Sequence, residues 1–77
     1  MIPQIYQTSS KTEAAYLVKL NNHLVHKVRL TESECIYLLS PKKDCIKNAI
    51  KYQGISENER EALSAIEALI DRIPPSN

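Results

Sequence analysis

A Ser-Pro pair near the middle of the chain, Ser40-Pro41, places the strongest local constraint on how this sequence can fold. Steric clash keeps the residue before a proline out of the α region, so any helix that precedes this pair has to end there. Serine is also a good N-cap, and proline at the first position of a helix gives up no needed hydrogen-bond donor. The pair therefore predicts a corner where one short helix ends and the next begins.

Capping patterns predict where the other helices begin. A serine or threonine is followed three residues later by glutamate at Ser10, Thr31 and Ser56. In this arrangement the hydroxyl accepts a hydrogen bond from the third residue, and the carboxylate reaches back to the free backbone N–H of the cap. Together with the Ser-Pro corner, these signals predict helices at about residues 11–29, 32–39, 41–53 and 57–73.

The spacing of apolar residues supports this assignment most clearly in the last segment. Its apolar side chains recur with the 3.6-residue period of a helix at Ala62, Leu63, Ile66, Leu69, Ile70 and Ile73. Residues 23–30 leave an alternative open, because their apolar and polar side chains alternate as they would in a strand. The chain shows no convincing partner strand, so we favour helix there.

We therefore expect an all-α fold, a small four-helix domain in the order long-short-short-long. Residues 1–77 would form a single helical domain, with a flexible arm at 1–9 and a tail at 74–77. The absence of Trp and Phe, with one glycine in 77 residues, indicates an aliphatic core of the kind that suits helices. A domain of this length buries only about 60% of its unfolded surface, so association with a partner would add stability.

Charge is distributed unevenly along the chain. Residues 1–51 hold eight Lys and Arg against four Asp and Glu, whereas residues 52–77 hold two basic and five acidic side chains. A basic first part permits contact with a polyanion. No run approaches the roughly 20 apolar residues that span a bilayer, and no signal-peptide pattern is present at the start. We expect a cytoplasmic protein that has no membrane contact.

Metal binding and catalysis find little support in the sequence. Cys35 and Cys45 lack the spacing of a zinc finger or redox pair, so we expect both to pack in the core as reduced thiols. His23 and His26 could share a metal with them only through an unusual ligand spacing. Serines and carboxylates stand mostly at helix caps, and no glycine-rich phosphate loop exists. We expect no enzymatic activity, no metal, no cofactor and no small-molecule substrate.

Two binding functions remain as hypotheses. In the first, the chain is a regulatory or adaptor protein that binds another protein or a second copy of itself through the apolar face of the last helix. The residues assigned to that contact are Leu63, Ile66, Leu69, Ile70 and Ile73.

In the second hypothesis, residues 32–51 form a helix-turn-helix that binds DNA as a transcriptional regulator. Its second helix would present side chains suited to phosphates and to one base edge, namely Lys42, Lys43, Lys47, Asn48 and Lys51. This segment lacks an arginine for bidentate contact with guanine.

Overall fold

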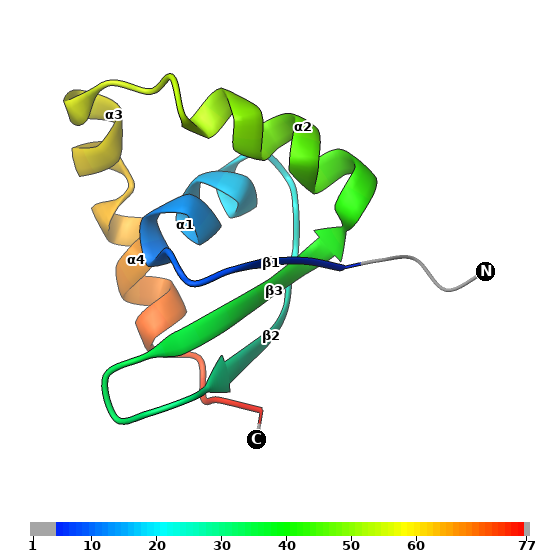
Figure 1. Cartoon of the computed structure of the whole chain (residues 1–77). Coiled ribbons are helices and arrows are strands. Elements are labelled where there is room, and N and C mark those ends of the chain that lie inside the picture. Colours follow the sequence, from blue (N-terminus) through cyan, green and yellow to red (C-terminus); the bar gives the residue numbers. More distant parts are fainter. Residues whose placement is uncertain (1–4, 77) are drawn as a thin grey trace.

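The computed structural model describes residues 5–76 and shows a domain that combines a sheet with helices (Figure 1). The prediction of an all-α helical bundle was therefore wrong. The elements follow one another as β1 (Ile5–Thr8), α1 (Lys11–Lys19), β2 (Leu24–Arg29), β3 (Cys35–Pro41), α2 (Lys42–Tyr52), α3 (Glu57–Ala62) and α4 (Ser64–Asp71).

The three strands form one antiparallel sheet in the order β1-β3-β2. β2 and β3 are joined as a hairpin, and α1 connects the two edge strands. The register places Tyr37 of β3 opposite Thr8 of β1 and opposite Lys27 of β2. It shifts between Leu24 and His26, where an extra residue bends β2.

The predicted helix at 11–29 is correct in its first half only. Its Ser10 cap forms as expected, because the Ser10 hydroxyl accepts a hydrogen bond from the Glu13 amide at 3.1 Å. The helix ends at Lys19, and Asn21 takes a positive φ of 73° that reverses the chain. Asparagine tolerates this left-handed conformation better than most residues. The segment that follows forms strand β2, which agrees with the strand alternative for residues 23–30.

The predicted helix at 32–39 was wrong, although its cap signal does form. The Thr31 hydroxyl accepts hydrogen bonds from the amides of Ser33 and Glu34, at 3.3 and 3.1 Å. These bonds fix the hairpin turn, which the Leu30 amide closes by donating to the Glu34 carbonyl at 2.9 Å. The corner at Ser40-Pro41 also exists, but it joins a strand to a helix.

The predicted helix at 41–53 agrees with α2, which begins after Pro41. The single long helix predicted at 57–73 was wrong, because this segment is helical but divides at Leu63 into α3 and α4. The Ser56 hydroxyl caps α3 by accepting from the Glu59 amide at 3.3 Å. Within the arm predicted at 1–9, residues Ile5–Thr8 form edge strand β1, while residues 1–4 lie outside the described part, as does residue 77 of the tail.

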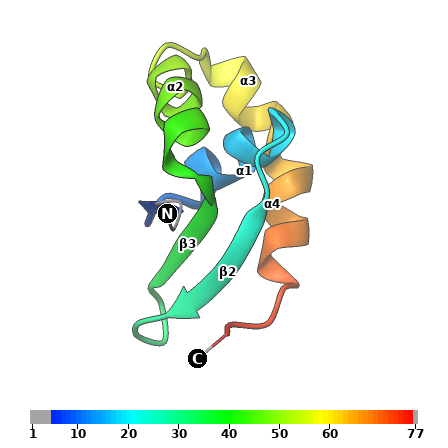
Figure 2. The same ribbon diagram turned by 90° about the vertical axis from the view of Figure 1, so that its right-hand side faces the viewer.

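The helices lie on one side of the sheet, and the core forms between them and the strands (Figures 1 and 2). Its buried apolar side chains are Ala14, Ala15, Leu17, Tyr37, Leu39, Cys45, Ala49, Leu63 and Ile70. No helix in the described part of the chain is both long enough and apolar enough to span a membrane.

One charged side chain is buried in this core, at the contact between β2 and α4. Lys27 is only 6% exposed. Its ammonium group donates to the carbonyls of Ile70, Asp71 and Ile73, at 3.2, 3.3 and 3.1 Å. Carbonyls at a helix C-terminus lack partners within the helix and carry the negative end of its dipole. Lys27 therefore provides hydrogen-bond donors to the carbonyl groups at the end of α4 and attaches that helix to the sheet.

Replacing Lys27 with methionine should destabilise the domain. Methionine keeps the length of the apolar stem but leaves three carbonyls without their donor, so we expect Lys27→Met to lower the free energy of unfolding by about 1–3 kcal/mol. Urea denaturation followed by circular dichroism measures the change. Lys47→Met, at an exposed position, is the matched control and should shift stability by less than about 0.5 kcal/mol. Equal losses in the two variants would contradict this role for Lys27.

Candidate functional site

The face of the sheet away from the helices is open, and the described strand residues that the register places on it include no Lys, Arg, Asp or Glu. Along β3, Tyr37 and Leu39 are buried on the helix side, whereas Ile36 and Leu38 alternate with them on the open side and are half-buried. Residues directly opposite in antiparallel strands share a face. The register therefore adds Val28, His26 and Gln7 to this surface. We call the five residues Gln7, His26, Val28, Ile36 and Leu38 the open face.

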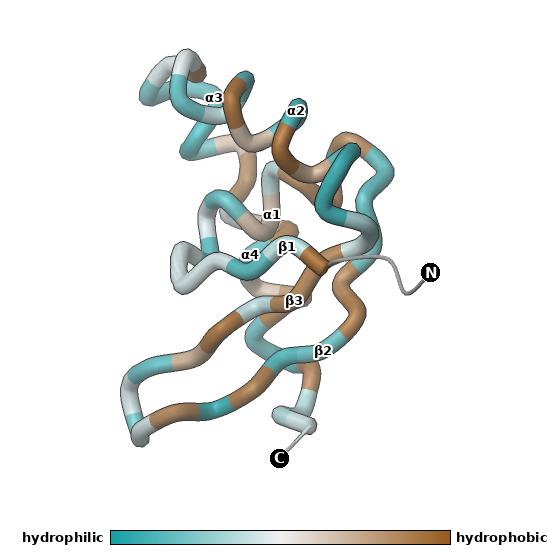
Figure 3. The backbone as a smooth tube through the Cα atoms, turned by 45° about the vertical axis from the view of Figure 1, so that its right-hand side comes forward, coloured by the Kyte–Doolittle hydropathy of each residue, from teal (hydrophilic) through white to brown (hydrophobic). Residues whose placement is uncertain are grey.

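Exposed apolar residues extend this region beyond the open face. Val25, the unpaired residue of the β2 bulge, is 42% exposed, and Leu30 at the hairpin turn is 57% exposed. Figure 3 shows hydrophobic residues along β2 and β3 as far as the hairpin. Neighbouring strands lie about 4.8 Å apart, and each residue adds about 3.3 Å along a strand. Three strands of about five residues therefore cover an area on the order of 250 Å². This area is well below the roughly 800 Å² that each partner buries in a standard interface.

The five residues predicted to bind a protein through the last helix do not form one exposed surface. Leu63 and Ile70 are 1% and 2% exposed and belong to the domain's own core. Ile66 is half-buried against that core. Leu69 and Ile73 remain 58% and 40% exposed. The apolar stripe therefore identifies a helical segment, but several of its side chains are buried in the core of the domain itself and are not available to a partner.

The residues predicted to bind DNA all lie on α2, but not within a helix-turn-helix. The element before α2 is strand β3, so the first helix of that motif does not exist. The four lysines are exposed on the helix surface, whereas Asn48 is half-buried. Asn48 donates from its side-chain nitrogen to the Asn22 side-chain oxygen at 2.6 Å.

A polar groove lies between α2 and the turn that follows α1. It has a volume of about 300 Å³ and is lined by Leu20, Asn21, Asn22, Asp44, Lys47, Asn48 and Lys51. Asn22 is 5% exposed and also donates to the Ser40 hydroxyl at 3.1 Å. These bonds hold the groove wall in one arrangement. Sequence reasoning missed the role of Asn22, although a pair of asparagines after a helix is a recognisable turn signal.

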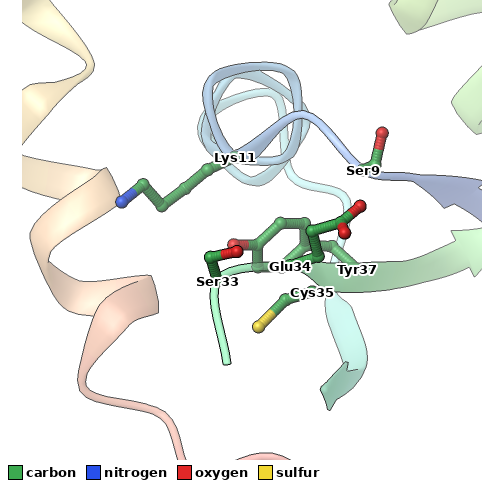
Figure 4. A pocket seen from close by; sticks show the side chains of 6 residues that line it. All are labelled: Ser9, Lys11, Ser33, Glu34, Cys35 and Tyr37. Atoms are coloured by element: carbon green, nitrogen blue, oxygen red, sulfur yellow. The ribbon is translucent and has the colours of Figure 1, made fainter. Parts of the chain in front are cut away.

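A second cavity, of about 330 Å³, opens between the start of α1 and the hairpin, and its lining residues are Ser9, Lys11, Ser33, Glu34, Cys35 and Tyr37 (Figure 4). Lys11 extends toward α4, where its ammonium group pairs with Asp71 at 2.9 Å. That hydrogen bond raises the pKa of Lys11, and burial raises the pKa of Tyr37, so both stay protonated at neutral pH. No hydrogen bond joins Cys35 to a base among the described residues.

The histidines and cysteines are separated in the fold. His23 and His26 are exposed near β2, whereas Cys45 is buried and Cys35 packs against the core as predicted. Within residues 5–76, no three side chains of the metal-binding types gather closely enough to hold a metal ion.

Comparisons with protein-family models, with curated proteins and with solved structures find no match to this chain. Its surfaces therefore have to be interpreted from their own geometry and chemistry.

The buried thiol of Cys45 predicts a loss of stability at alkaline pH. Burial raises the pKa of this thiol in the folded state, so the folded chain keeps a proton that the unfolded chain releases. The stability that this difference contributes is complete below the unfolded pKa of about 8.5 and is lost as the pH rises toward the folded pKa.

We therefore expect the urea midpoint of the domain to fall between about pH 8 and pH 9, below the range in which tyrosines titrate. Cys45→Ala should flatten this dependence, whatever its effect on stability at pH 7. Cys35→Ala keeps the buried thiol and serves as the control, so its profile should follow that of the original chain. A Cys45→Ala profile as steep as the original would contradict the assignment.

Proposed function

We propose that this protein is a small non-enzymatic adaptor that acts through the open face of its sheet, and that the occupant of this face is a second copy of the chain. The observation that carries the proposal is the composition of the open face, which is rich in apolar side chains and contains no Lys, Arg, Asp or Glu. Helices cover only the opposite side of the sheet.

The central strand supports this proposal. β3 carries apolar side chains on both of its faces, from Cys35 to Leu39. A strand that faces water on one side normally alternates apolar and polar residues, whereas a continuous apolar run is typical of a strand covered on both sides. The part of β3 on the open face therefore has the composition of an interior surface.

The chemistry of the open face favours a copy of the same chain as its partner. A twofold dimer brings identical patches together, so a charged patch would meet its own charge. The open face avoids that repulsion because it contains no Lys, Arg, Asp or Glu. Two such sheets can pack face to face at about 10 Å. The small footprint favours a reversible dimer over an obligate one.

Sedimentation equilibrium over a concentration series tests this proposal. We expect the apparent mass to rise from monomer toward dimer as the concentration increases from about 10 µM to about 1 mM. The double variant Ile36→Thr/Leu38→Thr keeps residues that favour strands but removes apolar surface, so it should remain monomeric.

The matched control is Leu69→Gln/Ile73→Gln, which removes exposed apolar side chains from the α4 surface and should dimerise like the original chain. If the control fails to dimerise while the β3 variant still does, the dimer contact lies on α4 and the proposal is overturned. A chain that stays monomeric at all concentrations would overturn it as well.

A further inference from the structure

We infer that the outer side of α2 binds the phosphate backbone of a nucleic acid, and that the polar groove beside it lies along the path of the bound strand. This second surface is carried by a helix and not by the sheet, so the inference goes beyond the proposed self-association. It uses α2 as a single exposed helix and requires no helix-turn-helix.

The lysines of α2 form a row. Lys43, Lys47 and Lys51 are spaced four residues apart, which places them on one side of a helix. A rise of about 1.5 Å per residue separates neighbours by about 6 Å along the axis and the outer two by about 12 Å. Lys42 is exposed at the start of the same helix. The arrangement can contact several phosphates of one backbone.

These lysines have no partner within the described part of the chain. The ammonium groups of the four take part in no hydrogen bond or ion pair there, whereas Lys11 pairs with Asp71 and Lys27 binds the end of α4. Like charges four residues apart destabilise a helix, and Lys42 opposes the positive end of the α2 dipole. An anionic ligand would relieve both effects.

The acidic side chains of the domain are concentrated on other elements. Glu57, Glu59 and Glu61 lie in α3. In α4, Asp71 is bonded to Lys11, and Glu67 accepts from the Thr12 hydroxyl at 2.9 Å. Asp44 is the acid on α2 itself and lines the groove. Four lysines against one carboxylate leave α2 with a local excess of positive charge.

The groove supplies fixed amide groups next to this charge. Asn48 and Asn22 are joined by their side chains at 2.6 Å, and Asn22 is anchored to Ser40. Asn21 is exposed beside them on the turn with positive φ. Asn22 is buried and serves only to hold Asn48 in place. The amides of Asn21 and Asn48 can contact base edges or sugar hydroxyls, while lysines contact phosphates. This combination favours a nucleic acid over an acidic protein, which would offer carboxylates but no base edges.

Fluorescence anisotropy with a labelled 20-base-pair DNA duplex of mixed sequence tests the inference. We expect a Kd of about 1–100 µM at moderate salt, the range of non-specific binding. The plot of log K against log salt should have a slope near −0.9 for each phosphate contact, so four lysines give a slope of about −3.6. Lys47→Gln should make the slope shallower by about 0.9, and the triple variant Lys43→Gln/Lys47→Gln/Lys51→Gln by about 2.7.

Arg72→Gln removes an exposed charge from the C-terminal end of α4 and is the matched control, so its slope should equal that of the original chain. Circular dichroism confirms that each variant is folded. The inference is overturned if the duplex does not bind at 20 mM salt and 100 µM protein, or if Lys47→Gln and Arg72→Gln change the slope equally. Tighter binding to polyglutamate than to the duplex at the same salt would also overturn the inference, because it would indicate that the partner of α2 is an acidic protein.

Discussion

The fold depends on a buried ammonium group held by the end of a helix. Lys27 enters the core from edge strand β2, and its three N–H groups are matched by three carbonyls at the end of α4. An unpaired charge would be costly in this position. The carbonyl dipoles offset that cost without a carboxylate, because Asp71 is already paired with Lys11. The Ser76 amide adds a bond to the Lys27 carbonyl, so the last part of the chain is tied to the same strand.

Local hydrogen-bond signals in the sequence were accurate, but they did not determine the elements that follow them. Ser10, Thr31 and Ser56 all accept the backbone hydrogen bonds expected of caps. After Ser10 and Ser56 the chain continues as a helix, whereas after Thr31 it turns into β3. A threonine hydroxyl satisfies amides in a turn as well as at a helix start. The choice at Thr31 is made by the pairing of β3 with β1, which is distant in the sequence, and with β2, whose strand-like alternation did not by itself outweigh the helix signals.

The candidate functional residues also divide into those that local sequence patterns could locate and those that depend on contacts between distant segments. Helical periodicity showed that residues 57–73 are largely helical, yet it could not tell that the segment divides at Leu63 or which side would face α1 and the sheet. Leu63 and Ile70 became core, while Leu69 stayed exposed. The α2 lysines were found because their exposure follows from the spacing of Cys45 and Ala49, the two buried residues of that helix. The open face was missed because it exists only once β3 is paired on both sides.

The two proposed surfaces make opposite use of charge, and this difference allows them to work independently. Apolar contact at the open face does not weaken with salt in the way that ion pairing does, because this face has no Lys, Arg, Asp or Glu. Contact at α2 weakens steeply with salt, because each phosphate that a lysine neutralises releases a counterion. The surfaces are carried by different elements, so occupation of one leaves the other exposed. Dimerisation would also place two α2 helices in one assembly. A nucleic acid long enough to reach both would then bind more tightly than a single helix allows, without any new contact.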